Sequence, residues 1–409
     1  MIGAALLLAA AAAAPATEAT MDAGAISPRI TPIRPHSHIH AGEHAPGEGP
    51  IVFDLSYSSD IMGTVAGGLK RRARYLDNLD LVMEVDLEEL VGWRGAEMHV
   101  YGLYNNGQSI SEVVGDAQMV SEMEANAQAF KLYEAWIDQM LAPNLSVRAG
   151  IYDLNSEFDM LETATLFVGG AHGMGSDIGM SGRNGPSIFP ATGLAARVLY
   201  RPAEGWAVRA AVLDGVPGNP DHPSRTSIRL GKGEGALLIG EVEAPVAGGR
   251  LLIGHWRYTS SFERFDGVTA DGVTADGNDG FYLRGEKTLA EDGDRKVDGF
   301  FRLGIADKKF NMFDRFASAG IKLGGWVGGR PDDEIGFAVI GAFTSPEYRR
   351  ANDSERAEMV AEATYRAPLT SWLTVQPNLQ YVRNPSADPT IDDAWVLGLR
   401  VEMAFRLID

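Results

Sequence analysis

Four of the eight histidines of this 409-residue chain lie close together near its beginning, at His36, His38, His40 and His44. Neutral imidazole is a ligand of intermediate softness that suits zinc and copper, so a cluster of this density could chelate either metal. The surrounding residues 21–50 are rich in Pro, Gly and Ala and show no periodicity, which is equally typical of a solvated linker. The sequence leaves both a metal site and a plain linker open for this segment.

Residue patterns that would indicate an enzyme are missing. The chain has no cysteine, which excludes disulfides, a thiolate nucleophile and a cysteine-based zinc site. It also lacks the usual signatures of hydrolases, zinc metalloproteases and nucleotide-binding enzymes in a usable context. The remaining histidines are isolated and are interpreted as structural: His99, His172, His222 and His255. The sequence therefore predicts neither an enzyme nor a bound cofactor.

Charged residues that alternate with apolar ones form a more informative set. Acids of this kind collect in the early and late parts of the chain: Asp80, Glu84, Asp86, Glu88, Glu134, Asp138, Glu358 and Glu362. Arginines of this kind collect between them: Arg148, Arg197, Arg209, Arg257, Arg284 and Arg302. Two opposed walls of carboxylates and guanidinium groups would order water and could hydrogen-bond neutral polyhydroxy solutes. The same residues would also fit ion pairs that serve only the fold.

The elements that must position these charges are strands. In the last segment, Trp395, Leu397 and Leu399 alternate with Gly398 and Arg400. This period of two is typical of a strand with water on one side and hydrocarbon on the other. The pattern recurs and predicts about 16 strands. Their expected ranges are 51–57, 79–88, 95–104, 131–140, 144–152, 192–201, 205–213, 235–244, 249–260, 279–289, 298–306, 316–325, 334–343, 356–366, 372–382 and 393–405.

The connections between the expected strands alternate in length. Those after even-numbered strands are short, whereas those after odd-numbered strands are mostly longer, with the longest at 105–130 and 153–191. A membrane barrel has this alternation, and a soluble sandwich has no reason to show it. The barrel must close, because an open sheet edge in hydrocarbon leaves unpaired amides at several kcal/mol each. We therefore predict an all-β fold: an antiparallel transmembrane β-barrel of about 16 strands, with short periplasmic turns and long, partly in-folded extracellular loops.

Aromatic residues are expected in two places in such a barrel. Those near strand ends would form girdles at the membrane interfaces: Trp206, Trp256, Tyr258, Trp326, Tyr365, Trp372 and Trp395. Inward-facing Tyr101, Trp136 and Tyr152 could offer flat faces to sugar rings or could pack under an in-folded loop.

The beginning of the chain indicates export. An apolar run that leads to Ala14-Pro15-Ala16 predicts a signal peptide over residues 1–16, with cleavage as late as residue 20. Residues 17–50 are predicted to be a flexible, His- and Pro-rich periplasmic leader, and residues 51–409 the barrel. The formal net charge of −19 argues against nucleic acid as a partner.

Blocks of sequence that run in order across residues 51–405 resemble the carbohydrate-selective porin family, OprB. Among them are ARYLDNLDLVMEVDLEELVGW, YNNGQSISEVVGDAQ, RAGIYDLNSEFD, NGPSIFP and VLGLRVEMAF. The resemblance implies a barrel in the outer membrane of a Gram-negative bacterium, in contact with outer-membrane lipid, inserted by the barrel assembly machinery and assembled as a homotrimer. It also implies facilitated diffusion of small neutral carbohydrates, monosaccharides such as glucose, into the periplasm.

The resemblance also suggests where the passage narrows. It places the ARYLDNLD block around the first long connection of the family, which implies that Arg72, Arg74, Asp77 and Asn78 lie near the constriction. With the alternating residues, the expected substrate pathway comprises Arg72, Arg74, Asp77, Asn78, Asp80, Glu84, Tyr101, Trp136, Arg148, Arg197 and Arg209. Two alternatives stay open: a general diffusion porin for small hydrophilic solutes, and a structural or binding barrel plugged by its loops.

Overall fold

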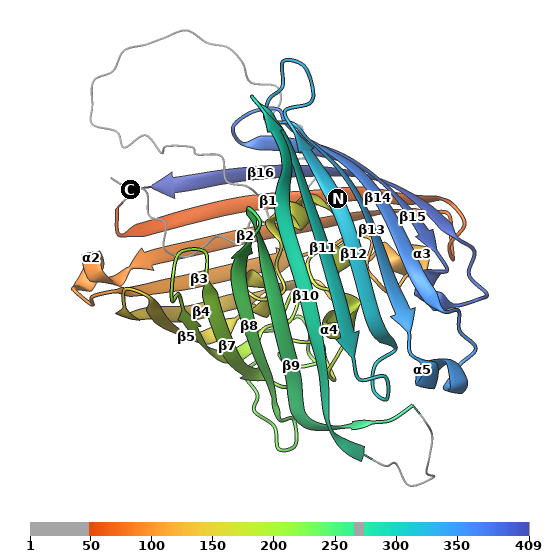
Figure 1. Cartoon of the computed structure of the whole chain (residues 1–409), viewed down its shortest axis with the longest axis horizontal. Helices are drawn as coiled ribbons and strands as arrows, with labels where there is room; N and C mark the ends of the chain where they lie inside the picture. Colours follow the sequence, from red (N-terminus) through yellow and green to blue (C-terminus); the bar gives the residue numbers. More distant parts are fainter. Residues whose placement is uncertain (1–48, 266–273, 409) are drawn as a thin grey trace.

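The computed structural model describes residues 49–265 and 274–408. In this part of the chain sixteen strands form one closed barrel, and each strand pairs antiparallel with its neighbour in sequence (Figure 1). The barrel closes between β1 and β16, from Val52 opposite Ile408 to Ala66 opposite Trp395. The predicted all-β barrel is confirmed. The predicted signal peptide lies outside the described residues.

Eleven of the sixteen strands are longer than predicted, whereas β5, β6 and β7 are one or two residues shorter. They are β1 Ile51–Ala66, β2 Ala73–Asp86, β3 Ala96–Asn105, β4 Ala129–Ala142, β5 Leu145–Tyr152, β6 Gly193–Tyr200, β7 Ala207–Asp214, β8 Ala236–Val246, β9 Gly249–Glu263, β10 Thr274–Asp292, β11 Arg295–Ala306, β12 Phe313–Gly324, β13 Glu334–Thr344, β14 Ala357–Pro368, β15 Leu373–Arg383 and β16 Ala394–Ile408. The connections hold short helices: α2 Leu87–Val91, α3 Ser111–Val114, α4 Ser176–Gly179, α5 Pro346–Ala351, η1 Leu154–Ser156, η2 Glu162–Leu166, η3 Gly170–His172 and η4 Pro385–Ala387. Among the residues that the structure describes, no helix is long and apolar enough to span a membrane.

The alternating pattern places apolar side chains outside the barrel and polar ones inside. On β16, Trp395 and Leu397 are 43% and 51% exposed, whereas Arg400 and Glu402 are each 3% exposed. Exposed Leu, Ile, Val and Phe side chains continue this surface around the wall. Such an exterior suits hydrocarbon, because a closed ladder has no open edge whose backbone amides would be unpaired in lipid.

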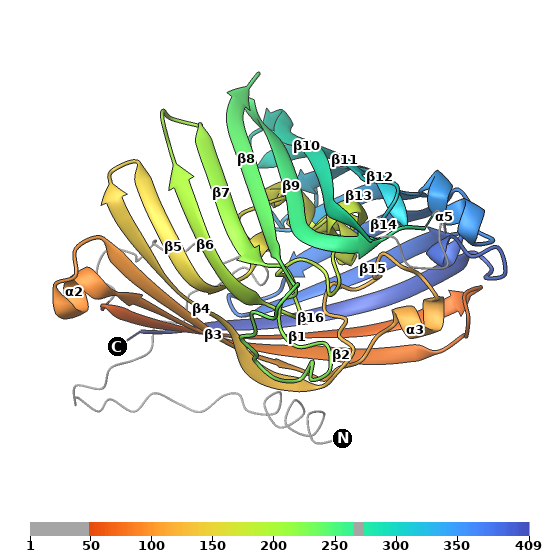
Figure 2. The same cartoon turned by 90° about the horizontal axis from the view of Figure 1, so that it is seen from below.

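The two rims of the barrel carry different connections. At the rim where β1 begins and β16 ends, the connections are short, and Figure 1 shows α2 there. At the opposite rim lie α3 and α5, and from it the loops 106–128 and 153–192 enter the barrel (Figure 2). Inside, Val113, Phe158 and Ile178 are fully buried among residues of the wall. The predicted short turns and long in-folded loops are confirmed.

The first connection is much shorter than predicted. β1 continues to Ala66 and β2 begins at Ala73, so only residues 67–72 join them. Three consecutive polar residues, Ser58, Ser59 and Asp60, interrupt the alternation of apolar and polar residues, so the predicted strand ends too early. In the structure all three are covered, at 0%, 8% and 1% exposure. Loop 106–128 reaches this part of the wall, where its Ser121 hydroxyl donates a hydrogen bond to Asp60 at 2.7 Å.

Strand β9 has its faces reversed relative to the prediction. Trp256 and Tyr258 are 0% exposed and face inward, so they do not belong to a girdle, and Arg257 between them faces outward. The inner face of β9 is apolar because it packs against the in-folded loop, in a cluster that includes Phe158 and Ile178. An apolar inner face is the opposite of what a water-filled lumen would require, which explains the error.

Candidate functional site

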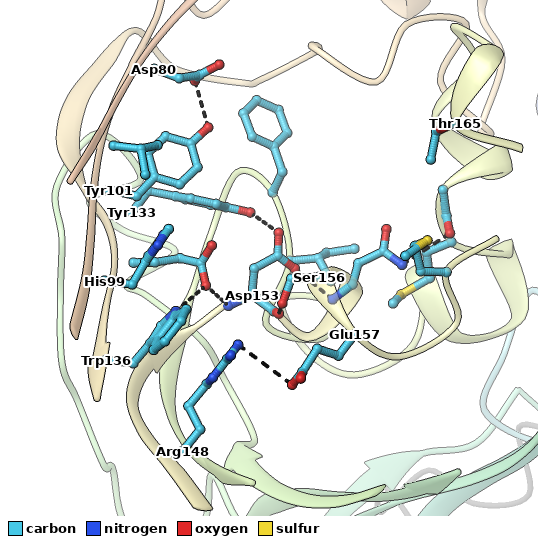
Figure 3. Close-up of a pocket in the computed structure, with 18 of the residues that line it drawn as sticks. Asp80, His99, Tyr101, Tyr133, Trp136, Arg148, Asp153, Ser156, Glu157 and Thr165 are labelled. Carbon is cyan, nitrogen blue, oxygen red and sulfur yellow. Dashed lines mark hydrogen bonds and ion pairs between the residues drawn. The ribbon is translucent and has the colours of Figure 1, made fainter. Parts of the chain in front are cut away.

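A cavity of about 570 Å³ lies between one part of the barrel wall and the in-folded loops. Side chains from β2 to β5 line one side and residues 153–165 line the other (Figure 3). Because the strands alternate, the wall offers mostly polar side chains at this level. A space of this size can hold one small solute molecule.

Two tyrosine–carboxylate pairs mark the cavity wall. The Tyr101 hydroxyl on β3 donates a hydrogen bond to Oδ1 of Asp80 on β2 at 2.6 Å. The Tyr133 hydroxyl on β4 donates to Oδ2 of Asp153 in the loop at 2.5 Å. The two rings meet edge to face, with centroids 4.9 Å apart. Carboxylate oxygens have several lone pairs, so these pairs can also accept hydrogen bonds from the hydroxyls of a solute.

Trp136 on β4 is covered on both faces. The His99 ring on β3 stacks on it with centroids 4.7 Å apart and planes 7° from parallel. The Arg148 guanidinium on β5 lies 3.5 Å from the ring centroid. The indole N–H donates to Glu134 at 3.1 Å, and the whole residue is only 4% exposed. Of the two expectations for Trp136, the structure supports packing rather than a flat face for a sugar ring.

An arginine–carboxylate cluster attaches the loop to the wall. Arg197 donates from Nε and Nη2 to Glu157 in the loop at 2.7 and 2.8 Å, and from Nη2 to Asp138 at 2.7 Å. Arg148 also donates to Asp138, at 3.0 Å. Burial acts to raise the pKa of Glu157, but Arg148 and Arg197 outweigh it and lower this pKa to about 2. Glu157 is therefore charged at neutral pH and holds its segment of the loop against β6.

Two carboxylates of β14 hold the loop backbones from the other side of the barrel. Glu362 accepts hydrogen bonds from the N–H groups of Val168 and Gly169 at 2.7 and 3.1 Å. Glu358 accepts from the N–H groups of residues 117–118 at 2.9 and 3.1 Å. Both acids are buried, so they serve the loops and are shielded from a permeating solute.

The structure brings six of the predicted pathway residues to the cavity: Asn78, Asp80, Tyr101, Trp136, Arg148 and Arg197. Two others face inward without lining it. Glu84 is 7% exposed with Oε1 3.5 Å from Nδ1 of His99, and Arg209 pairs with Glu243 at 2.8 Å.

The remaining three predicted residues lie away from the cavity. Arg72 is the last residue of the first connection, at the rim that carries α3 and α5, and Arg74 lies near the start of β2, 3.5 Å from Glu112. Asp77 faces outward, because it has the opposite parity to Asn78 and Asp80 on β2, and its carboxylate accepts a hydrogen bond from Tyr57 at 2.9 Å. The prediction that Asp77 lies in the pathway is therefore wrong. The expected long first connection, on which that prediction depended, does not exist.

The expected pair of opposed charged walls is also wrong. The inward arginines bond to carboxylates next to them and do not face acids across an open lumen. Arg284 donates to Glu241 on β8 at 2.8 Å, and Arg302 is bonded to Asp159 and Asp177 of the loop. Charge is thus compensated locally around the wall.

Sequence reasoning missed most of the acids that bind these arginines. Glu157, Asp159 and Asp177 lie in a loop without alternation, so no periodic signal indicates where they point. Glu241 and Glu243 were detectable, because they flank the outward-facing Val242 in the same way as the acids that were chosen.

The predicted metal site cannot be placed. His36, His38, His40 and His44 lie outside the described residues, so that hypothesis stays a prediction. Within residues 49–265 and 274–408, no group of three or more His, Asp or Glu side chains is arranged to hold a metal ion. The cavity side chains instead offer hydrogen-bond donors and acceptors.

A closed antiparallel barrel with an apolar exterior, short turns at one rim and a polar interior narrowed by loops defines an outer-membrane porin. Residues 70–405 match the model of the carbohydrate-selective porin family, OprB, and the chain belongs to this family. It is an outer-membrane porin for carbohydrates, and the family and the fold make it a channel.

Curated and solved relatives agree with this assignment. Porin B of Pseudomonas aeruginosa is 26% identical over 402 residues, which cover 86% of this chain and 87% of that protein. The putative porin QuiX of Acinetobacter baylyi is 21% identical over 369 residues, covering 80% of this chain and 82% of that protein. The high-pH structure of Pseudomonas putida OprB superimposes with a TM-score of 0.75 at 23% identity, covering 87% of this chain and 94% of that one, and shows the shared fold.

Proposed function

We propose that this porin passes small neutral sugars, monosaccharides such as glucose, by facilitated diffusion into the periplasm of a Gram-negative bacterium. The observation that carries the proposal is the pair of tyrosine–carboxylate contacts at the cavity wall, Tyr101 with Asp80 and Tyr133 with Asp153. A sugar hydroxyl both donates and accepts hydrogen bonds, so it can replace water at such groups without leaving a polar atom unpaired.

The charge arrangement supports a preference for uncharged solutes. Asp138 and Glu157 are already bonded to Arg148 and Arg197, so an ionic solute would have to compete with buried ion pairs. Such pairs cost several kcal/mol to break when one partner is left buried and uncompensated. A neutral solute avoids this cost because it can bond to the remaining lone pairs.

The proposed pathway runs from the external rim through the cavity. Arg72 and Arg74 lie at its external end, and Asn78, Asp80, Tyr101, Arg148 and Arg197 lie along the cavity. The other three predicted residues, Trp136, Glu84 and Arg209, pack or pair with neighbouring side chains of the barrel wall and so stabilise it.

The proposal includes the surroundings of the barrel. The apolar exterior supports contact with outer-membrane lipid and insertion by the barrel assembly machinery, after export directed by the predicted signal peptide. A homotrimer is supported by outward-facing Asp77, opposite Ser59 in the middle of β1, because a carboxylate at that height is costly against lipid and is better placed against another subunit. Light scattering of the detergent-solubilised protein tests the homotrimer. A monomeric mass would contradict the homotrimer and leave the proposed sugar permeation unaffected.

Single-channel recording in planar bilayers tests the proposed permeation. Glucose should reduce the ion current in a saturable way, and proteoliposomes should swell faster in glucose than in sucrose or in a charged sugar acid of similar size to glucose. An ion-conducting channel that is indifferent to sugars would instead indicate a general diffusion porin. Absence of conductance from heat-modifiable protein would indicate a plugged barrel, an alternative that the many loop-to-wall hydrogen bonds keep relevant.

A further inference from the structure

Arg302 on β11 lies behind loop 153–192 and binds it at two points. Its Nε donates to both carboxylate oxygens of Asp159, at 2.8 and 2.9 Å. Its Nη1 and Nη2 donate to the two oxygens of Asp177, at 2.6 and 3.2 Å. The exposed fractions are 3% for Arg302, 2% for Asp159 and 0% for Asp177. One buried guanidinium therefore binds two buried carboxylates from separate turns of the loop.

The residues around Arg302 leave space for its contacts with both Asp159 and Asp177. A Cβ atom at Gly175 would lie 2.1 Å from Nη1 of Arg302, and one at Gly304 would lie 2.1 Å from Oδ2 of Asp177. The guanidinium also lies over the Phe316 ring, 4.8 Å from its centroid. The two glycines leave room for a bidentate arginine and its carboxylates, and a larger residue at either position would displace them. Guanidinium geometry matches such a two-point contact, which a lysine could not make.

Asp159 connects this anchor to the cavity. Its φ of 55° lies in the left-handed region, which costs energy for a residue other than glycine and persists only where contacts hold it. Its backbone N–H donates to Glu241 on β8 at 3.2 Å, so the residue is held by groups from two different strands. Glu157 on one side of Asp159, and Met160 and Leu161 on the other, line the cavity. The position of Asp159 therefore sets the loop edge that narrows the passage.

We propose that Arg302 is a positioning residue for solute size selection: it fixes the width of the passage by holding Asp159 and Asp177, without touching the solute. The inference rests on the proposed sugar permeation and adds the group that sets its size limit. Removal of the guanidinium leaves two carboxylates unpaired in a buried site, which is unfavourable until the loop moves toward water. The moved loop edge then admits larger sugars.

Arg302→Met tests this proposal, because methionine fills part of the same space without a charge. In proteoliposome swelling, the wild-type preference for glucose over sucrose should be lost in the variant. In planar bilayers, the open-channel current should become noisy, because a loop segment that repeatedly detaches and reattaches, as in lid opening, does so in microseconds to seconds. Arg315→Met is the matched control: Arg315 lies on the adjacent strand β12, its side chain is 55% exposed, and it pairs with neighbouring Asp314 at 3.3 Å. The control should keep the wild-type preference and a quiet current.

Asp177→Asn provides a second, milder variant, since it removes one carboxylate and leaves the contact of Arg302 with Asp159. It should lose part of the size preference. If both variants kept the wild-type preference for glucose over sucrose and the wild-type level of current noise, the inference would be overturned, while the proposed function would stand. A wild-type protein that does not discriminate between the sugars would refute the proposed function, and this inference with it. If neither variant formed a heat-modifiable barrel while Arg315→Met did, the contact would serve folding and the inference would be overturned.

Discussion

Replacement of Glu157 by glutamine should loosen loop 153–192 at neutral pH. The carboxylate accepts hydrogen bonds from Arg197 at 2.7 and 2.8 Å and from the Tyr152 hydroxyl at 2.5 Å. Its side chain is 17% exposed, so water screens these contacts only partly. Glutamine keeps the shape and one acceptor oxygen and removes the negative charge.

The size of the effect follows from the pKa of Glu157. Burial raises this pKa, and Arg148 and Arg197 lower it further than burial raises it, from 4.5 to about 2. A lowered pKa means that the charged form stabilises the folded loop. That stabilisation is fully present above pH 4.5 and is lost as the pH falls through about 2. The difference corresponds to about 3 kcal/mol, or roughly 300-fold in the population of the detached loop, and is an upper bound because glutamine still accepts one hydrogen bond.

Hydrogen exchange followed by mass spectrometry measures this loosening in detergent. The backbone N–H groups of Ser156 and Phe158 donate to Asp153 and Leu154 at 3.2 and 2.9 Å, so they exchange only when this turn opens. In Glu157→Gln at pH 7, a peptide that covers the turn should exchange between about tenfold and a hundredfold faster than in the wild type.

The control and the refuting result are both defined by the structure. Glu112→Gln removes a carboxylate that is 70% exposed and lies 3.5 Å from Arg74, so exchange around residue 157 should not change. Wild-type exchange of the same turn in Glu157→Gln would refute the reasoning, since it would show that the charge of Glu157 contributes nothing to loop attachment.

Three further substitutions test the wall. Tyr101→Phe should weaken the block of single-channel current by glucose up to about tenfold, because it removes a hydroxyl from the cavity, with little change in ion conductance. Trp136→Ala should lower the temperature of heat modification on gels, reflecting a loss of about 3–5 kcal/mol from a ring covered on both faces, while the glucose block changes less than in Tyr101→Phe. Gly150→Ala should prevent barrel formation, because Gly150 has a φ of 148° and a Cβ there would lie 2.2 Å from the backbone oxygen of Ala135. The control Gly240→Ala should fold, since its nearest neighbour would lie at 3.9 Å.

The barrel was predictable because its signal is local and repeated. In a strand such as β16, the alternation of residues 395–400 alone shows which side chains face inward and which face outward. The short turns after even-numbered strands fix the topology without any long-range information. The prediction failed where the lumen is filled. On β9 the inner face carries Trp256 and Tyr258 because a folded loop, and not water, covers it.

The site was only partly predictable for the same reason. Asp80 and Tyr101 lie on strands, so alternation placed them on the inner face. Asp77 was misplaced because a family resemblance put it near a loop, whereas parity along β2 puts it outside. Glu157 lies in a loop, where only the folded chain shows that it meets Arg197.

The in-folded loops bind several inward charges of the barrel wall, and this arrangement affects which groups determine selectivity. Inward charges of the strands, such as Arg302, Glu358 and Glu362, are occupied by the loops and do not meet the solute. In the proposed pathway the solute meets the tyrosine hydroxyls and carboxylates along one side and the edge of loop 153–192 on the other. A barrel wall changes its radius only when the number or the register of its strands changes, whereas a loop edge moves when one anchor is altered. Substitutions that change which sugar passes should therefore map to the loop and its anchors, and those on the lipid-facing wall should change assembly alone.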